Sequence, residues 1–196
     1  MTSLPERLRQ ETRLLHQQTE QLFYTEALQN ATLTVAQYEH LLRTHLVFHQ
    51  DLETAIDQHS DFFRDYEPLT RKKTPWLLAD LDYLNSPKPA PMANLFIDWS
   101  PIALLGAAYV GEGSMLGGTV IWKLLQNNKA IEPLLAQTRF YQGYGSATGN
   151  YWRNFGSFLT RNGSATPDVV IEAAKQAFVT YQQIFEQTEP VRLLNE

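Results

Sequence analysis

The stretch YVGEGSMLGGTVIW, residues Tyr109–Trp122, is rich in glycine although strong helix formers flank it on both sides. Its glycines are Gly111, Gly113, Gly117 and Gly118. Each glycine in a helix interior costs roughly 0.5–1 kcal/mol relative to alanine, so the four cost about 2–4 kcal/mol. Glycines allow close helix packing, a bend, or the near approach of a flat ligand to the backbone. Because they are bunched with Ser114 in an apolar segment, this helix can form one wall of a slot.

The residues around this stretch also have helical periodicity, and the alternation typical of strands is scarce. Four sites combine a hydroxyl residue with a proline: Ser3-Leu4-Pro5-Glu6, Thr74-Pro75, Ser100-Pro101 and Thr166-Pro167. The hydroxyl can cap the first amides of a helix, and proline lacks only an N–H that the first turn does not use. Ser3 with Glu6 also fits a capping box. We therefore predict a helix start at each site.

Apolar residues at spacings of three and four predict the extents of the helices. The predicted ranges are 4–28, 34–56, 74–84, 100–125, 146–159 and 166–187, with a proline-rich connection at 85–94. No repeat or break in composition indicates a second domain. The prediction is an all-α bundle of six or more helices forming a single domain over residues 1–196.

The composition excludes several classes of function. The chain has 16 basic and 21 acidic residues, a net charge of −5, and no long block of like charges, which disfavours nucleic acid as a partner. It contains 0 cysteines, so disulfides, thiolate metal sites and cysteine nucleophiles are excluded. No signal peptide or long apolar run is found. We expect a cytoplasmic protein that does not associate with a membrane.

Histidine 16 is the first candidate for chemistry. It lies one turn after Thr12 and one turn before Glu20, in line with the apolar residues of the first predicted helix, so we expect it to face the interior. Arg9 and Arg13 precede it at distances that suit the carboxylates of a cofactor. Glu20 can fix the tautomer of the ring. Two interpretations remain open: a hydrogen-bonded histidine at the edge of the core, or an axial ligand of a metal or haem.

His45 and His49 form a rival site, because an i, i+4 pair followed by Glu53 aligns three possible metal ligands. The two histidines also lie on the core face of their predicted helix, which favours buried structural histidines. A di-iron bundle normally carries Glu-x-x-His pairs on two helices, and the sequence has none. We expect a structural role for both histidines.

These residues together resemble a known family. Thr12-x-x-x-His16-x-x-x-Glu20, followed by Glu112-Gly113-Ser114-x-x-Gly117-Gly118, is similar to the haem oxygenases, and most similar to the bacterial, bacteriophytochrome-associated type. The similarity continues through DLDYL at 80–84, NYWRNFGSFL at 150–159 and VIEAAKQAFVTYQQIFE at 170–186. It therefore spans most of the chain in the same order.

The resemblance implies an all-α fold in which haem b lies between a proximal helix and a kinked distal helix. It implies that His16 is the iron ligand and that Thr12 and Glu20 support it. The distal, catalytic side then consists of Gly113, Ser114, Gly117 and Gly118. Haem contacts are further expected from Arg9, Arg13, Tyr109 and Arg153, with the arginines near the propionates.

The implied activity is O₂- and electron-dependent cleavage of haem to biliverdin, CO and iron, with a ferredoxin or a reductase as electron donor. The sequence departs from the animal members at Ser114, where they carry an aspartate, and it lacks their hydrophobic C-terminal anchor. An alternative is a haem-binding protein for storage or sensing that has no turnover. A thiaminase-like hydrolase needs the absent cysteine. A ligand-free helical scaffold is the remaining alternative.

Overall fold

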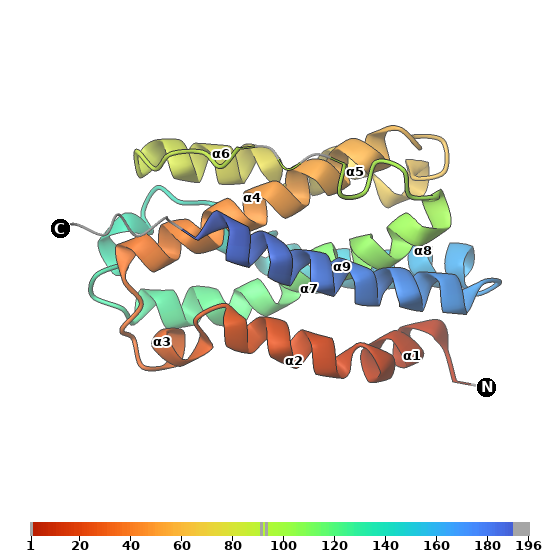
Figure 1. Ribbon diagram of the computed structural model, residues 1–196, viewed down its shortest axis with the longest axis horizontal. Coiled ribbons are helices and arrows are strands. Elements are labelled where there is room, and N and C mark those ends of the chain that lie inside the picture. Colours follow the sequence, from red (N-terminus) through yellow and green to blue (C-terminus); the bar gives the residue numbers. More distant parts are fainter. Residues whose placement is uncertain (1, 91, 93, 190–196) are drawn as a thin grey trace.

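The computed structural model describes residues 2–90, 92 and 94–189, and within these ranges the chain forms α-helices and short 3₁₀ helices without strands (Figure 1). The all-α prediction is confirmed. The N-terminal segment consists of three successive helices, α1 (Leu4–Glu11), α2 (Arg13–Leu22) and α3 (Thr25–Gln29). The prediction of one helix over 4–28 is therefore wrong at two places.

Both breaks have local causes. At Thr12 the backbone opens to φ −99° and ψ −2°, and the hydroxyl donates to the Leu8 carbonyl at 2.7 Å. A threonine that bonds back into the previous turn tends to bend a helix. At Tyr24 the backbone is left-handed, with φ 57°. The Tyr24 hydroxyl lies 2.7 Å from His40 Nδ1, so a distant contact holds this turn.

The next helices form one side of the bundle. Helix α4 (Val35–Asp57) begins at a capping box in which Thr34 and Gln37 exchange hydrogen bonds. The chain then passes through η1 (Arg64–Tyr66) and α5 (Pro68–Arg71) to α6 (Thr74–Tyr83), which packs along α4 (Figure 1). These bounds agree with the predicted ranges 34–56 and 74–84 to within one residue at each end.

Helix α7 (Pro101–Gln126) runs through the middle of the molecule without interruption, so none of its glycines ends it. The kink that we predicted in this helix stays a prediction. The chain continues through short 3₁₀ helices to the last two helices of the described chain. Their bounds are η2 (Glu132–Leu134), η3 (Phe140–Gln142), η4 (Gly145–Ala147), α8 (Thr148–Gly163) and α9 (Pro167–Thr188).

Close packing of α7 on α9 explains a fifth glycine in α7. A Cβ added at Gly106 would lie 2.4 Å from the Val170 carbonyl oxygen and 2.6 Å from the Ala174 nitrogen. The two backbones can approach this closely only because Gly106 has no side chain. Gly106 therefore has a packing role that the outer glycines of the helix do not share.

All four predicted helix starts are confirmed, but the predicted capping by their hydroxyl residues is confirmed only at one of them. A proline occupies the first turn at each of them. Ser100 caps its helix by accepting from the Ala103 N–H at 3.2 Å. Ser3 and Thr166 make no capping hydrogen bond, so the predicted capping box at Ser3 is wrong. Thr74 lies inside α6, where its buried hydroxyl has no partner among the described residues.

The core consists of two clusters of buried side chains that share α4 and α7. One cluster centres on Phe48, Phe155 and Tyr181, and the other on Tyr38, Phe140 and Tyr141. Because the same two helices supply both clusters, we continue to propose one domain over residues 1–196. Across the described residues, no helix combines the length and apolar character needed to cross a membrane.

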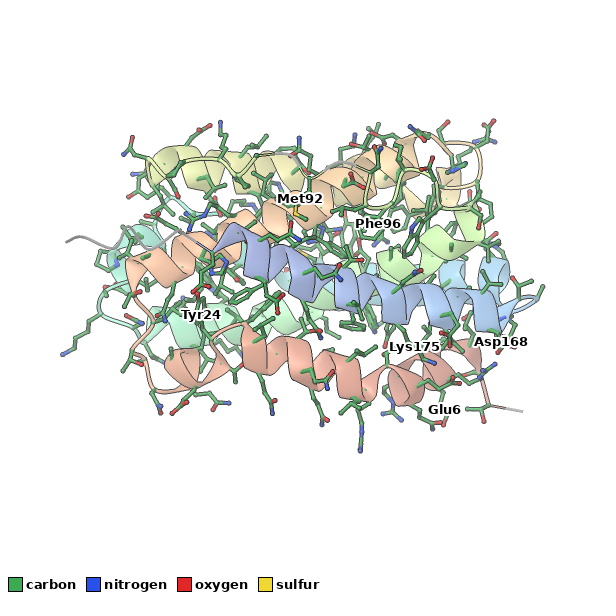
Figure 2. The ribbon with its side chains drawn as sticks, in the orientation of Figure 1. Glu6, Tyr24, Met92, Phe96, Asp168 and Lys175 are labelled. Carbon is green, nitrogen blue, oxygen red and sulfur yellow. The ribbon has the colours of Figure 1, made fainter. Side chains whose placement is uncertain are left out.

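The N-terminal segment lies along one edge of the bundle and is joined to α9 by exposed ion pairs. Arg7 Nη2 lies 2.8 Å from Asp168 Oδ1, and Lys175 Nζ lies 3.9 Å from Glu11 Oε2. Figure 2 shows Asp168 and Lys175 on α9 facing this edge. Exposed pairs of this kind contribute little stability, about 0–1 kcal/mol each. The N-terminal segment is held at this end mainly by Leu4 and Leu8, which are 4% and 0% exposed and belong to the core, and the ion pairs add little.

Candidate functional site

His16 lies on α2 and is half exposed, with 54% of its side chain accessible. The prediction that it faces the interior is wrong. The physical reason is that α9 covers α2 on the side of Thr19, which accepts from Gln182 Nε2 at 3.0 Å. The His16 ring touches α9 only by an edge contact with Phe178, at 5.8 Å between centroids. Most of the imidazole therefore remains accessible to a ligand.

Glu20 lies beside the His16 ring, with Oε2 3.4 Å from Nδ1. A carboxylate at this nitrogen favours the tautomer that carries its proton on Nδ1. The other ring nitrogen, Nε2, is then the one with a lone pair to bind a metal. The structure thus brings together two of the residues that the sequence analysis selected, and their roles stay predictions.

Thr12 does not project toward a ligand, because it is 2% exposed and donates to the Leu8 carbonyl. It instead meets Tyr109 of α7. Burial raises the pKa of the Tyr109 hydroxyl, and a hydrogen bond with Thr12 and the charge of Arg9 act in the opposite direction. Thr12 and Tyr109 therefore join the N-terminal segment to α7, one turn before His16 on one helix and one turn before Gly113 on the other.

The four glycines of the opening stretch lie on two different sides of α7. Gly111 and Gly118 are buried, and a Cβ at Gly111 would meet Leu52 of α4 at 3.2 Å. Gly117 is exposed, and a Cβ there would have no atom within 4 Å. At Gly113 the nearest atoms belong to Trp152, at 4.0 Å. The outer pair, Gly113 and Gly117, therefore presents bare backbone to open space.

Between two contacts of the N-terminal segment with α7, both α2 and α7 leave residues exposed, and we call this interval the opening. The two segments touch at Thr12 and Tyr109, and again where α3 contacts α7. Figure 1 shows α2 and α7 running in the same direction between these contacts. Along this interval α2 exposes His16, and α7 exposes Gly117 together with Leu116 (41%) and Val120 (60%). An exposed histidine on α2 and an exposed stretch of α7, in which bare backbone at Gly117 alternates with apolar side chains, thus lie between the same two contacts.

Ser114 lies on the partly buried side of the wall. Its hydroxyl donates to the Gly111 carbonyl at 2.7 Å, and its Oγ lies 3.5 Å from His49 Nε2. Burial, together with the charges of Lys73 and His45, lowers the pKa of His49 well below its ordinary value. The group behind Ser114 is therefore a neutral imidazole, and the wall carries no charged acid at this position.

Three arginines predicted to face the haem carboxylates are exposed. Arg9 and Arg13 lie on α1 and α2, and Arg153 lies on α8, where Nη1 donates to Asn150 Oδ1 at 2.9 Å. Among the described residues none of the three forms an ion pair, unlike their neighbour Arg7. They remain available to an anionic ligand, and their role stays a prediction.

The predicted burial of His45 and His49 is confirmed, and their structural role stays a prediction. They are 4% and 1% exposed, and His45 lies between the hydroxyls of Tyr181 and Tyr141. Burial lowers the pKa of His45 to about 3. Glu53 turns away from them and accepts the Lys73 N–H at 2.6 Å. Within the described residues, no three histidine, cysteine, aspartate or glutamate side chains gather in a way that suits a metal ion.

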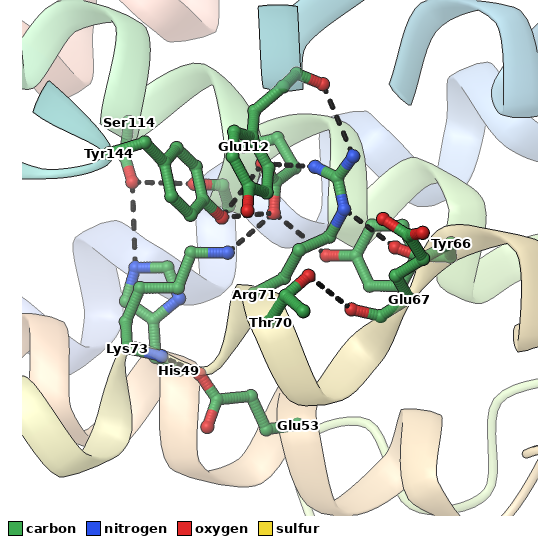
Figure 3. Close-up of polar contacts among 12 residues, drawn as sticks. His49, Glu53, Tyr66, Glu67, Thr70, Arg71, Lys73, Glu112, Ser114 and Tyr144 are labelled. Carbon is green, nitrogen blue, oxygen red and sulfur yellow. Dashed lines mark hydrogen bonds and ion pairs between the residues drawn. The ribbon is translucent and has the colours of Figure 1, made fainter. Parts of the chain in front are cut away.

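Sequence reasoning missed the charged cluster behind the wall, which we call the Glu112 cluster. Its members are Glu112, Arg71, Lys73, Tyr66 and Tyr144 (Figure 3). The one signal in the sequence was an acidic residue inside an otherwise apolar helix, which predicts a partner of opposite charge. Nothing in the sequence indicated that Arg71 and Lys73 supply the partner charge, because both lie in a short polar run.

The fold is similar to that of two solved bacterial heme oxygenases. The heme oxygenase of Neisseria meningitidis, solved with NO and CO bound, superimposes with a TM-score of 0.79 at 20% identity, covering 100% of this chain and 96% of that one. The heme oxygenase of Leptospira interrogans gives a TM-score of 0.77 at 18% identity, covering 95% and 100%. A search of curated protein sequences returns no match.

A match to a family model extends the comparison from the fold to the family. Residues 2–187 match the family model described as "Heme oxygenase". The match covers nearly the whole chain, including α2, α7 and the connection between them. The chain therefore belongs to the haem oxygenase family.

Proposed function

We propose that this protein is a haem oxygenase that cleaves haem to biliverdin, CO and iron in an O₂- and electron-dependent reaction. One observation carries the proposal: an accessible histidine on α2 lies between the same two contacts as a stretch of α7 whose outer positions 113 and 117 have no Cβ. A flat porphyrin needs such a pair of walls, with an iron ligand on one side and a surface that approaches closely on the other.

The residues present fit haem b. Gly113 and Gly117 leave the room that a Cβ would fill, and Leu116 and Val120 supply apolar contact for the ring. Arg9, Arg13 and Arg153 lie within the same part of the fold and can pair with the propionates. His16 is the proposed iron ligand, with Glu20 and Thr12 in support.

When bound, haem supplies both the iron that takes up O₂ and the ring carbon that is oxidised. The protein then has three tasks. His16 holds the iron as a neutral ligand, which does not promote O–O cleavage as a thiolate does. The backbone at Gly113 and Gly117 would confine the space beside a bound ring, because it can come closer than any side chain. Ser114 donates its proton to the Gly111 carbonyl and offers Oγ as an acceptor, so it can hold water at this wall.

The finer parts of the proposal rest on the sequence. The motif Thr12-x-x-x-His16-x-x-x-Glu20 together with Glu112-Gly113-Ser114-x-x-Gly117-Gly118 favours the bacteriophytochrome-associated type of bacterial haem oxygenase. The electron donor in the proposal is a ferredoxin or a reductase, and the compartment is the cytoplasm. The absence of cysteine from the chain suits that compartment.

A second candidate function is haem storage or sensing without turnover. The observation that favours it is the uncharged distal side, where Ser114 and a neutral His49 replace an acid. Ser114 can order water but cannot contribute a negative charge. The two candidates differ in what happens to the bound haem when electrons are supplied.

The test is a haem titration followed by reduction. We expect the purified protein to bind haem with a sharpened Soret band, and His16→Ala to weaken binding by at least about a hundredfold, roughly 2.7 kcal/mol. His59→Ala, on the turn after α4, is the matched control and should bind haem normally. With ascorbate or a reductase, an oxygenase loses the Soret band as a bilin band rises. A stable Soret band under reduction would favour storage, and normal binding by His16→Ala would refute the ligand assignment.

A further inference from the structure

A buried carboxylate lies directly beside the outer glycines of α7. Glu112 Oε2 accepts from Arg71 Nη1 at 2.9 Å, and Oε1 accepts from Lys73 Nζ at 2.5 Å. The two cations are each 3% exposed and the carboxylate side chain is 1% exposed. Both bonds join α7 to the segment that contains α5 and the start of α6 (Figure 3).

Two tyrosines connect Glu112 to further elements of the fold. Tyr66 of η1 donates to Glu112 Oε1 at 2.9 Å, and the Tyr144 hydroxyl lies 3.2 Å from both carboxylate oxygens. Tyr144 stacks on Tyr151 of α8, with ring centroids 4.0 Å apart and planes 6° apart. Arg71 also donates to the Tyr151 carbonyl at 3.3 Å. One side chain of α7 thus contacts groups from three neighbouring parts of the fold.

The charges of the Glu112 cluster tie the Glu112 carboxylate to its particular partners. Burial acts to raise the pKa of Glu112, but the charges of Lys73 and Arg71 outweigh it and lower the pKa, so the carboxylate is ionised. A buried ion pair adds little net stability, because desolvation of the charges offsets their attraction. Removal of one member is costly, however, since it leaves the others buried and unpaired. The cluster therefore defines one geometry for α7 more than it adds stability.

The outer glycines Gly113 and Gly117, which we call the glycine wall, need contacts elsewhere on α7 to fix their position. Outward from Gly113 and Gly117, a Cβ would meet only Trp152 at 4.0 Å or nothing at all, so neighbouring side chains do not fix these turns. Inward, the side chains next to the glycines are Glu112 and Met115, each 2% exposed. Met115 is flexible and apolar and tolerates displacement. Glu112, with directional charged bonds, does not.

We propose that Glu112 is a positioning residue whose carboxylate, held by the other members of the Glu112 cluster, fixes the depth at which Gly113–Gly118 lie against a bound haem. The meaning of this depth for haem rests on the proposed function. The anchoring itself is a property of the protein without haem and can be measured there.

The test is amide hydrogen exchange of the haem-free protein. In Glu112→Gln we expect the amides of residues 113–118 to exchange at least about tenfold faster than in the unchanged protein, relative to the amides of α9. The matched control is Asp51→Asn on α4, a carboxylate that is less buried than Glu112 and accepts the Phe96 N–H at 2.7 Å. This variant should loosen residues near 96 and leave 113–118 unchanged.

A milder variant covers the case in which Glu112→Gln does not fold. Tyr144→Phe removes one donor and keeps the ring stack on Tyr151, so we expect a smaller acceleration in the same amides. Unchanged exchange at 113–118 in every variant that folds would overturn the proposal. With haem and a reductant, Glu112→Gln should also alter the proportions of the bilin isomers. If the unchanged protein takes up no haem, the proposed function fails, and the exchange data still decide the anchoring.

Discussion

At the scale of single residues, the glycines of α7 carry out opposite tasks, and alanine substitution separates them. Gly106→Ala places a methyl against the backbone of α9, 2.4 Å from the Val170 oxygen. Overpacking of this kind costs about 1–3 kcal/mol. Gly117→Ala meets nothing within 4 Å and should stabilise the haem-free protein by roughly 0.5–1 kcal/mol. Urea unfolding of the two variants measures both effects.

The same Gly117→Ala variant tests the haem wall. The added methyl points into the opening, so we expect weaker haem binding in a protein that is more stable without haem. Loss of affinity together with gain of stability is the opposite of what a packing glycine gives, and Gly106→Ala serves as that comparison. Should Gly117→Ala bind haem as tightly as the unchanged protein, the bare backbone at 117 has no role in the site.

Sequence reasoning at this scale was reliable where a residue acts within its own helix. The burial of His45 and His49 followed from spacing, because spacing fixes which residues share a helix face. The prediction that Gly118 shares the outer side with Gly113 and Gly117 is wrong, because it rested on the bunching of the glycines and Gly118 lies on the buried side of α7. The half exposure of His16 did not follow, since it depends on how far α9 covers α2. The partners of Glu112 lie 39 and 41 residues earlier, and no local pattern encodes contacts at that separation.

At the scale of elements, α4 carries three buried histidines, and burial lowers the pKa of each. The pKa of His45 is about 3, against an ordinary value of 6.5. Between these values the unfolded chain binds a proton that the folded protein excludes, so the free energy of unfolding falls as the pH falls. Removal of one such histidine should lower the slope of the free energy of unfolding against pH by up to about 1.4 kcal/mol per pH unit.

His45→Gln tests the predicted direction in which the free energy of unfolding changes with pH. Urea unfolding between about pH 4 and pH 6 should show a flatter dependence on pH than the unchanged protein. Asp80 gives the opposite comparison, because burial raises its pKa to about 6 and the folded protein holds the proton more tightly. Asp80→Asn should therefore steepen the dependence. Parallel curves for all three proteins would show that neither group is buried as the structure describes.

Helix extents were predictable where a helix ends for local reasons and unpredictable elsewhere. The prolines in first turns placed the starts of α7 and α9 to within one residue. The division of the N-terminal segment at Tyr24 arises from a hydrogen bond to His40 and from packing on Phe185, 161 residues away. Helical periodicity continues through such a break, so the pattern alone favoured a single helix.

At the scale of the whole molecule, haem should close the fold along the opening between α2 and α7. Without haem, the N-terminal segment is held at its start by the buried Leu4 and Leu8, while α2 packs on α9 and leaves His16 exposed. A ligand held by His16 on one side and by the glycine wall on the other adds a connection between the two helices. At a free haem concentration about a hundredfold above Kd, the gain is about 2.7 kcal/mol.

Because haem would connect α2 and α7, its binding predicts which amides become protected from hydrogen exchange. Haem should slow amide hydrogen exchange in α2 and in residues 113–120 of α7 together, and should raise the melting temperature of the protein. In His16→Ala both effects should disappear at the same haem concentration, while the exchange of α4 and α6, which lie away from the opening, should match the unchanged protein. Protection confined to α2 would mean that haem binds at the surface of that helix, and the glycine wall would then have no part in its recognition.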